Sequence, residues 1–181
     1  MRLGSRMRGF LLVALAAACG DDPFTVTDPE FSYTVSRDNG DELTIEGAGA
    51  SWGVTEFQTP AGFQSRLRIQ LSADVGAGDN PLSTPTLFID SQNDDLARDE
   101  PEPGTYEVVP TGEQFMAVTI GTSSGSYVAD GGSVVISESS SSGLRGTLDL
   151  HFRPFDPVEV PNFDLVGEFS ARNFSELPAI R

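Results

Sequence analysis

The sequence predicts an all-β domain, an antiparallel β-sandwich of about ten short strands. Apolar residues recur with a period of two from residue 31 onward, which is the spacing of a strand that buries one face. Turn-forming residues separate these runs, and no stretch of ten residues after the first twenty carries an apolar stripe at helical spacing. A sandwich whose two sheets share one core fits this pattern, and a closed barrel is the alternative.

The alternation places the strands along the chain. Residues 66–73 give the clearest case, because the leucines and the isoleucine point one way while the arginines and other polar residues point the other way. Residues 146–152 and 163–171 alternate in the same manner. The other expected strands, in chain order, are Phe31–Val35, Leu43–Ile45, Trp52–Phe57, Thr86–Ile89, Thr105–Val109, Phe115–Ile120 and Ser133–Ser137.

Residues that favour turns cluster between these strands. Gly, Pro, Asn and Asp supply the backbone conformations and local hydrogen bonds that turns need. The predicted turns are Asp38–Asp41, Pro60–Gly62, Gly78–Pro81, Gly131-Gly132 and Ser139–Gly143. The Ser-rich runs Thr122–Ser126 and Ser137–Ser142 are expected to form hairpin loops.

Residues 1–18 are predicted to be a secretory signal peptide. Arg2, Arg6 and Arg8 form a positive segment, and the apolar run Phe10–Ala18 follows it. This run is about ten residues long, whereas a helix that crosses a bilayer needs about twenty. The sequence therefore indicates export without a transmembrane helix.

The end of the apolar run reads Leu15-Ala16-Ala17-Ala18-Cys19-Gly20 and resembles the lipobox of bacterial lipoproteins. The resemblance implies a diacylglycerol, with acyl chains such as palmitate, on the Cys19 sulfur and cleavage that leaves Cys19 as the new N-terminus. An ordinary signal peptidase site before Cys19 is the alternative, but it would leave a lone thiol on an exported protein. Gly20, where Asp would retain a lipoprotein at the inner membrane, resembles an outer-membrane sorting signal. We therefore expect lipidation at Cys19 and a location in the cell envelope, at the outer membrane.

Residues 19–30 are expected to form the lipidated Cys and a flexible tether, and residues 31–181 a single β-sandwich domain. The tether is polar, contains two prolines and reaches roughly 35 Å when fully extended. Two or three acyl chains attach a protein durably, because a single chain binds only marginally.

The chain is strongly acidic. It has 11 positive residues, all of them Arg, against 27 acidic ones, and loss of three arginines with the leader leaves a net charge of −19. Such a charge repels both nucleic acid and anionic lipids, so membrane contact is expected to come from the lipid anchor alone. One Cys and one His exclude a disulfide framework and centres rich in Cys or His, and we predict no cofactor.

The second half of the chain, from about residue 104 to 171, carries a pattern of short segments. Its segments are Gly104-Thr105-Tyr106, Ser133–Ile136, Gly143–Leu150 and Gly167–Ala171. The pattern is similar to that of uncharacterised envelope lipoprotein domains with a "GTY … GSV-I … GT-F-F … G-F-A" layout. This resemblance implies a β-sandwich and a lipoprotein, and it implies no activity.

One motif suggests catalysis. Residues Gly49–Gly53 match G-x-S-x-G, which places a nucleophilic Ser on a sharp turn between a strand and a helix in α/β-hydrolases. Ser51 would be the nucleophile and His151 the only available base. Because the residues after Ser51 continue as a strand, a bend of small residues beside Trp52 is the preferred interpretation. Carboxylate pairs for glycoside hydrolysis carry almost no signal here, because some pair will always look eligible among 27 acidic residues.

Two acidic segments and a set of aromatic residues suggest binding. Asp90–Glu100, and more weakly Asp38, Asp41 and Glu42, offer oxygen atoms that could hold Ca²⁺, although the EF-hand pattern fails and solvated acidic loops are the alternative. Four aromatic residues could form a platform that stacks on a sugar, namely Trp52, Tyr33, Tyr106 and Tyr127. The alternative is that they belong to the hydrophobic core.

The sequence thus favours a non-catalytic binding or structural module of the cell envelope, anchored by lipid, with an envelope protein or a glycan as ligand. The alternative is an anchored enzyme that hydrolyses glycans or esters. The first needs only the anchor, the tether and the domain. The second needs a cleft with converging polar groups, and no convincing nucleophile and base are visible in the sequence.

Overall fold

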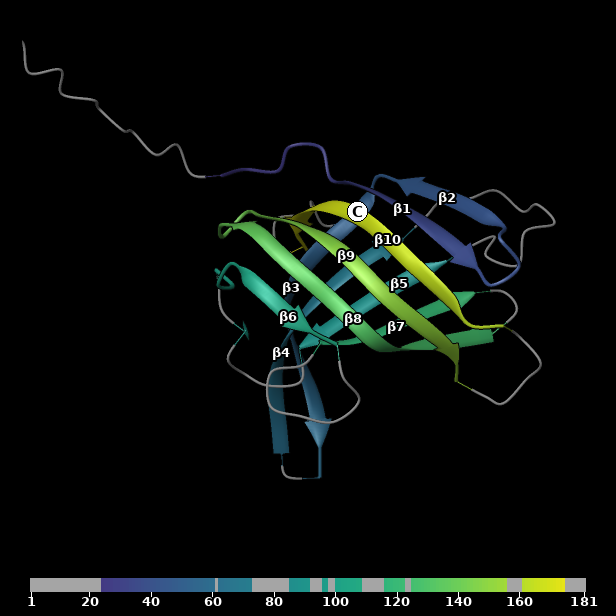
Figure 1. The fold of residues 1–181 in the computed structure, drawn as a ribbon. Helices are drawn as coiled ribbons and strands as arrows, with labels where there is room; N and C mark the ends of the chain where they lie inside the picture. The colour runs from purple at the N-terminus through teal and green to yellow at the C-terminus, as the bar shows by residue number, and fades with distance from the viewer. Residues whose placement is uncertain are drawn as a thin grey trace, which may run out of the picture.

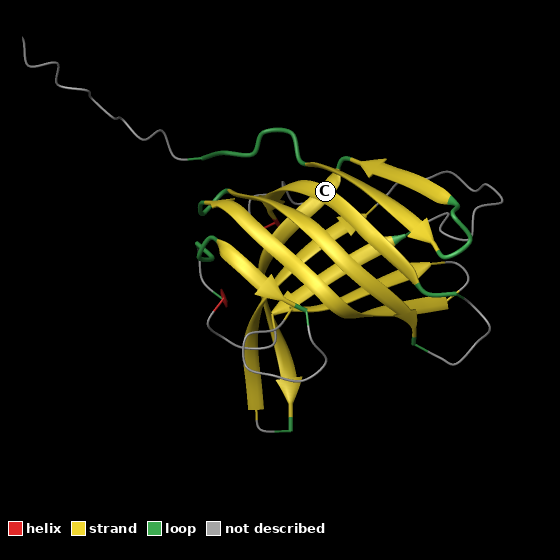
Figure 2. Ribbon diagram, viewed as in Figure 1, coloured by secondary structure: helices red, strands yellow, loops and turns green. Residues whose placement is uncertain are grey.

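The computed structural model describes residues 24–60, 62–72, 85–91, 96–97, 100–108, 116–122, 125–155 and 161–174. None of these residues forms an α-helix, and the ten strands that they form confirm the all-β prediction (Figure 2). The strands are β1 (Glu30–Arg37), β2 (Glu42–Gly47), β3 (Gly49–Thr59), β4 (Gly62–Ser72), β5 (Thr86–Ser91), β6 (Gly104–Glu107), β7 (Met116–Thr122), β8 (Gly125–Ser139), β9 (Gly143–Pro154) and β10 (Phe163–Asn173).

Seven of the strands close into a barrel, in place of the predicted sandwich (Figure 1). Around the ring the order is β3, β4, β5, β7, β8, β9 and β10, and β10 returns to β3. All neighbours are antiparallel except β10 and β3, which run parallel. The alternation of apolar residues is the same in both architectures, since each buries one face of every strand.

The barrel closes at β10. One edge of β10 pairs with β9, and the other edge pairs with β1 as far as Ser170. Beyond that point Arg172 and Asn173 pair in parallel with Ser51 and Trp52 of β3. Because β1 occupies most of this edge and β2 pairs with β1, strands β2, β1, β10, β9 and β8 form one continuous surface.

The predicted turn at Gly131-Gly132 is wrong, because both glycines lie inside the long strand β8. The pairing with β9 shifts by one residue between Ala129 and Gly131, which marks a β-bulge. Gly132 has φ +103°, and a Cβ there would lie 2.0 Å from the Asp149 carbonyl oxygen. The bend lets one edge of β8 pair first with β7 and then with β6.

One hydrophobic core contains the inward-facing residues of the described strands. Its largest fully buried side chains include Trp52, Tyr33, Phe152 and Phe169. Phe152 stacks on Phe163 with ring centroids 4.9 Å apart. Complete burial of one such side chain contributes about 1.5–3 kcal/mol, so the core is the main source of stability.

The signal peptide predicted at residues 1–18, and Cys19 with it, lie outside the described residues. Among the residues that are described, no helix has the length and apolar character needed to cross a membrane. The described part of the expected tether begins at Phe24, whose carbonyl oxygen accepts hydrogen bonds from the barrel.

Candidate functional site

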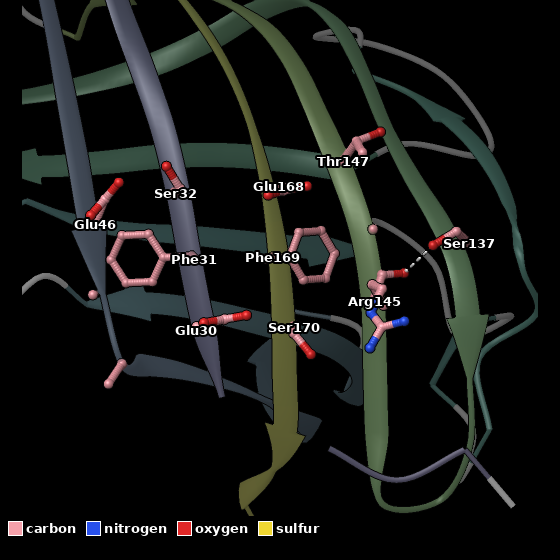
Figure 3. A pocket seen from close by; sticks show the side chains of 13 residues that line it. Glu30, Phe31, Ser32, Glu46, Ser137, Arg145, Thr147, Glu168, Phe169 and Ser170 are labelled. Atoms are coloured by element: carbon pink, nitrogen blue, oxygen red, sulfur yellow. Dashed lines mark hydrogen bonds between the residues drawn. The ribbon is translucent and has the colours of Figure 1, made fainter. Parts of the chain in front are cut away.

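A groove of about 620 Å³ crosses the outer surface of β2, β1, β10, β9 and β8 (Figure 3). We call it the acidic groove. It is lined by Glu30, Phe31, Ser32, Glu46, Gly47, Ala48, Ser137, Arg145, Gly146, Thr147, Glu168, Phe169 and Ser170.

Strand register explains how these side chains come together. Glu46, Ser32, Glu168 and Thr147 form one row across four strands, and Glu30, Ser170 and Arg145 form a second row (Figure 3). Between the rows, Phe31 and Phe169 face the opposite way and are buried, so their backbone forms the floor. The serines are short, and the groove is therefore bounded by the longer glutamate and arginine side chains.

Negative charge dominates the groove. Glu30, Glu46 and Glu168 line it, and Arg145 is the only positive residue among its described lining residues. The Arg145 Nη1 atom lies 2.8 Å from Glu138 Oε2, so this cation already has an acidic partner outside the groove. Carboxylates gathered in this way attract a ligand that carries positive charge.

The segment 24–29, which we call the N-terminal strap, lies beside the groove. The hydroxyl groups of Ser140 and Ser142, in the turn between β8 and β9, both donate to the Phe24 carbonyl oxygen. The Arg172 Nε atom donates to the Val26 carbonyl oxygen at 3.3 Å, and Val26 itself is buried. The expected tether is therefore attached to the barrel over its described part.

The strap and the groove share one side chain. The Arg145 guanidinium lies over the Phe24 ring at 5.0 Å from the ring centroid, and Arg145 also lines the groove. A contact of this kind contributes about 0.5–1 kcal/mol at an exposed site. One end of the groove is consequently next to the point where the chain enters the barrel.

His151 lies on the outer surface of β9 between two carboxylates, away from the groove. Its Nδ1 atom is 2.6 Å from Asp164 Oδ1, and its Nε2 atom is 4.0 Å from Asp130 Oδ1. The hydrogen bond to Asp164 raises the pKa of His151, and the charge of Asp130 adds to this effect. Arg153 also approaches Asp130, with Nε 3.5 Å from Oδ2.

The structure does not bring Ser51 and His151 together. Ser51 is paired with Arg172 of β10, whereas His151 is paired with Asp164 of the same strand. These two partners, Asp164 and Arg172, are eight residue steps apart, which corresponds to about 26 Å along a strand. A nucleophile and its base need to lie about 3 Å apart. Ser51 also lies within a continuous strand and not on a strand-to-helix turn, so the hydrolase hypothesis loses its only nucleophile and base.

The first acidic segment is partly accounted for by an ion pair. Asp90, in β5, accepts two hydrogen bonds from Arg68 of β4, at 2.6 and 2.9 Å, and this pairing raises the pKa of Arg68. Residues 92–95, 98 and 99 of the same segment lie outside the described residues. In the second cluster, Asp41 accepts a hydrogen bond from the Asn39 amide. No group of three or more potential metal ligands occurs within the described ranges.

The aromatic residues considered for sugar binding belong largely to the core. Trp52, Tyr33 and Tyr127 are all buried, and Tyr106 packs against the core from a partly buried position. Burial raises the pKa of the Tyr33 hydroxyl well above its ordinary value. These residues therefore do not form an exposed stacking surface.

Sequence reasoning missed the acidic groove, although the sequence contains a signal for it. The tripeptide Glu-Phe-Ser occurs at residues 30–32 and again at residues 168–170. The two copies pair antiparallel, so that Glu30 faces Ser170 and Glu168 faces Ser32. The repeat could have been read as a pair of matching strand segments, but only the register shows that they are neighbours.

No protein-family model, curated protein or solved structure matches the chain.

Proposed function

We propose that the chain is a lipoprotein of the bacterial cell envelope, anchored through Cys19, that acts as a non-catalytic binding module. The acidic groove receives its ligand, and the ligand carries positive charge. The observation that supports this proposal is the groove itself, a depression of about 620 Å³ that is lined by three glutamates and one arginine. The lipobox-like segment Leu15–Gly20 supports the anchor.

The spacing of the carboxylates suggests the form of the ligand. Glu30 and Glu168 are diagonal neighbours on paired strands, a relationship that separates side chains by about 7–8 Å. Glu46 and Glu168 flank Ser32 on its two sides, about 10 Å apart at two strand spacings. Alternate residues of an extended peptide are about 7 Å apart. A lysine-rich, extended segment of an envelope protein fits these distances.

Several charges have to act together. Two unit charges 4 Å apart attract by about 1 kcal/mol in water and by about 4 kcal/mol near a protein surface. A single ammonium group would therefore bind weakly, whereas two or three at matching spacing would bind measurably. Binding should weaken as salt is added.

Titration calorimetry with the peptide Lys-Ala-Lys-Ala-Lys tests the groove. We expect binding at low ionic strength and at least a tenfold loss of affinity in the double variant Glu30→Gln/Glu168→Gln. The matched control Glu42→Gln/Asp149→Asn removes the same charge from exposed positions outside the groove and should change affinity less than twofold. Equal losses in both variants, or no binding by the unaltered protein, would contradict the proposal. Cleavage of an envelope glycan or ester by the purified protein would contradict its non-catalytic part.

Mass spectrometry of the protein purified from bacterial membranes tests the anchor. We expect the N-terminal peptide to begin at Cys19 and to carry the added mass of two or three acyl chains. The variant Cys19→Ala should leave the membrane fraction. An unmodified thiol, or an intact leader, would refute the anchor.

A further inference from the structure

We propose that the N-terminal strap fixes the orientation of the barrel on the membrane, with the groove next to the lipid surface and the β3–β4 hairpin directed away from it. The inference rests on the anchor at Cys19 put forward above. It adds that the strap side of the barrel is held next to the headgroup layer of a bilayer, by the anchor and not by attraction between the acidic barrel and the lipids.

The strap is attached by several independent contacts. Ser140 and Ser142 both donate to the Phe24 carbonyl oxygen, and Arg172 donates to that of Val26. The donors lie in the β8–β9 turn and in β10, more than a hundred residues along the chain from the strap. All of these bonds have to break before the strap can leave the barrel.

Packing adds to these bonds. Val26 is 5% exposed and lies directly over Gly143, where an added Cβ would be 2.5 Å from the Val26 side chain. Any larger residue at position 143 would displace the strap. Together with the Arg145 contact to Phe24, this packing fixes the strap at the end of the barrel where β9 begins.

The remaining length of chain is short. Five residue steps join Cys19 to Phe24, and they span at most about 18 Å. A domain of about 150 residues has a radius of gyration near 15 Å and a diameter near 40 Å. The anchor therefore cannot reach the far side of the barrel, and the strap side must stay close to the bilayer.

The two sides of the barrel differ in what they present. The strap, drawn in purple in Figure 1, lies on the side opposite to the projecting β3–β4 hairpin. Phe63, at the start of β4, is 73% exposed on that hairpin. The groove shares Arg145 with the strap, so a ligand would enter it near the level of the headgroups.

Site-specific labels can test this orientation. The only Cys in the chain is Cys19, which carries the lipid, so single cysteines can be introduced and labelled without interference. Ser141→Cys places a fluorophore in the exposed β8–β9 turn, and Phe63→Cys places one on the hairpin. Each acylated protein is inserted into vesicles of phosphatidylcholine and phosphatidylglycerol at a ratio of 4:1, with an energy-transfer acceptor on a fraction of the headgroups.

We expect strong energy transfer from the label at position 141 and at least threefold weaker transfer from position 63. In the variant Val26→Asp, the energy transfer from the two labels should become similar, because a buried carboxylate would release the strap from the barrel. The control Thr27→Ala, at an exposed position of the strap, should leave the two values different. Equal transfer from both labels in the acylated wild-type background would overturn the orientation and leave the anchor intact. Absence of the acyl mass on the same samples would overturn both.

Discussion

Phe31 of β1 lies directly opposite Phe169 of β10, and the two residues are the centres of the paired Glu-Phe-Ser tripeptides. Both rings are buried in the core, and the flanking glutamates are thereby directed to the outer surface. The core and the groove thus depend on the same register. A shift of β1 by one residue against β10 would bury Glu30 and expose the Phe31 ring.

Truncation of either ring should destabilise the barrel. Phe169→Ala is expected to lower the free energy of unfolding by about 3–5 kcal/mol, because it leaves a cavity in a packed core. Phe63→Ala, which removes the same atoms from an exposed position, should change it by less than about 0.5 kcal/mol. Urea unfolding of both variants provides the measurement. Similar losses in the two variants would contradict the inward placement of Phe169.

The bulge in β8 makes two adjacent glycines unequal. Gly132→Ala should destabilise the protein by more than about 1 kcal/mol, since the position has positive φ and abuts the Asp149 carbonyl. Gly131→Ala should have little effect or a small stabilising one, because nothing lies within 4 Å of its added methyl group. Thermal unfolding of the two variants compares the positions directly. A larger loss at Gly131 would mean that the bulge is misplaced.

The pairing of His151 with Asp164 should make stability depend on pH. The folded state raises the pKa of His151 above the unfolded value of about 6.5, so its contribution is fully present below that value and is lost as pH rises through the folded pKa. The side chain is 45% exposed, so the effect should be only a few tenths of a kcal/mol. Unfolding free energies of wild type and Asp164→Asn, measured from pH 5.5 to 8.5, should differ more at the acidic end. A difference that grows with pH would contradict this assignment.

The Arg68–Asp90 ion pair should contribute more to the free energy of unfolding than an exposed surface pair does. Its bidentate geometry and partial burial predict that Asp90→Asn costs about 1–3 kcal/mol. Asp149→Asn, at an exposed position of β9, serves as the control and should be nearly neutral. The same unfolding curves, recorded with and without a chelator, also test the calcium hypothesis for this segment. A midpoint that falls with chelator in wild type but not in Asp90→Asn would show that Asp90 has a metal as a partner as well.

The strands were predictable from sequence, but their closure was not. Runs such as Leu67-Arg68-Ile69 reveal a strand with one buried face whatever the architecture. Closure depends on Arg172 and Asn173 pairing with β3, a contact between distant parts of the chain that no local pattern encodes. The prediction of a turn at Gly131-Gly132 fails for the same reason. The glycines stay within β8 because β8 pairs with β6 on one edge and with β9 on the other, and this pairing is not visible in the sequence.

The candidate site was less predictable than the fold. Its glutamates come from three strands, and each one alone is an ordinary exposed residue of an alternating strand. The candidates that were chosen by residue type do not form a site. Ser51 and His151 lie far apart, and Trp52 and Tyr33 are core residues. The chemistry of a residue type can be read from the sequence, whereas the strand order is needed to know which side chains come together in one site.

The short contact between β3 and β10 has a mechanical consequence. Two residue pairs join these strands, whereas every other neighbouring pair in the ring shares at least four. Local opening starts where the fewest cooperative hydrogen bonds must break. The cylinder should therefore uncurl first along this join, while β1 and β9 keep β10 paired on both of its edges.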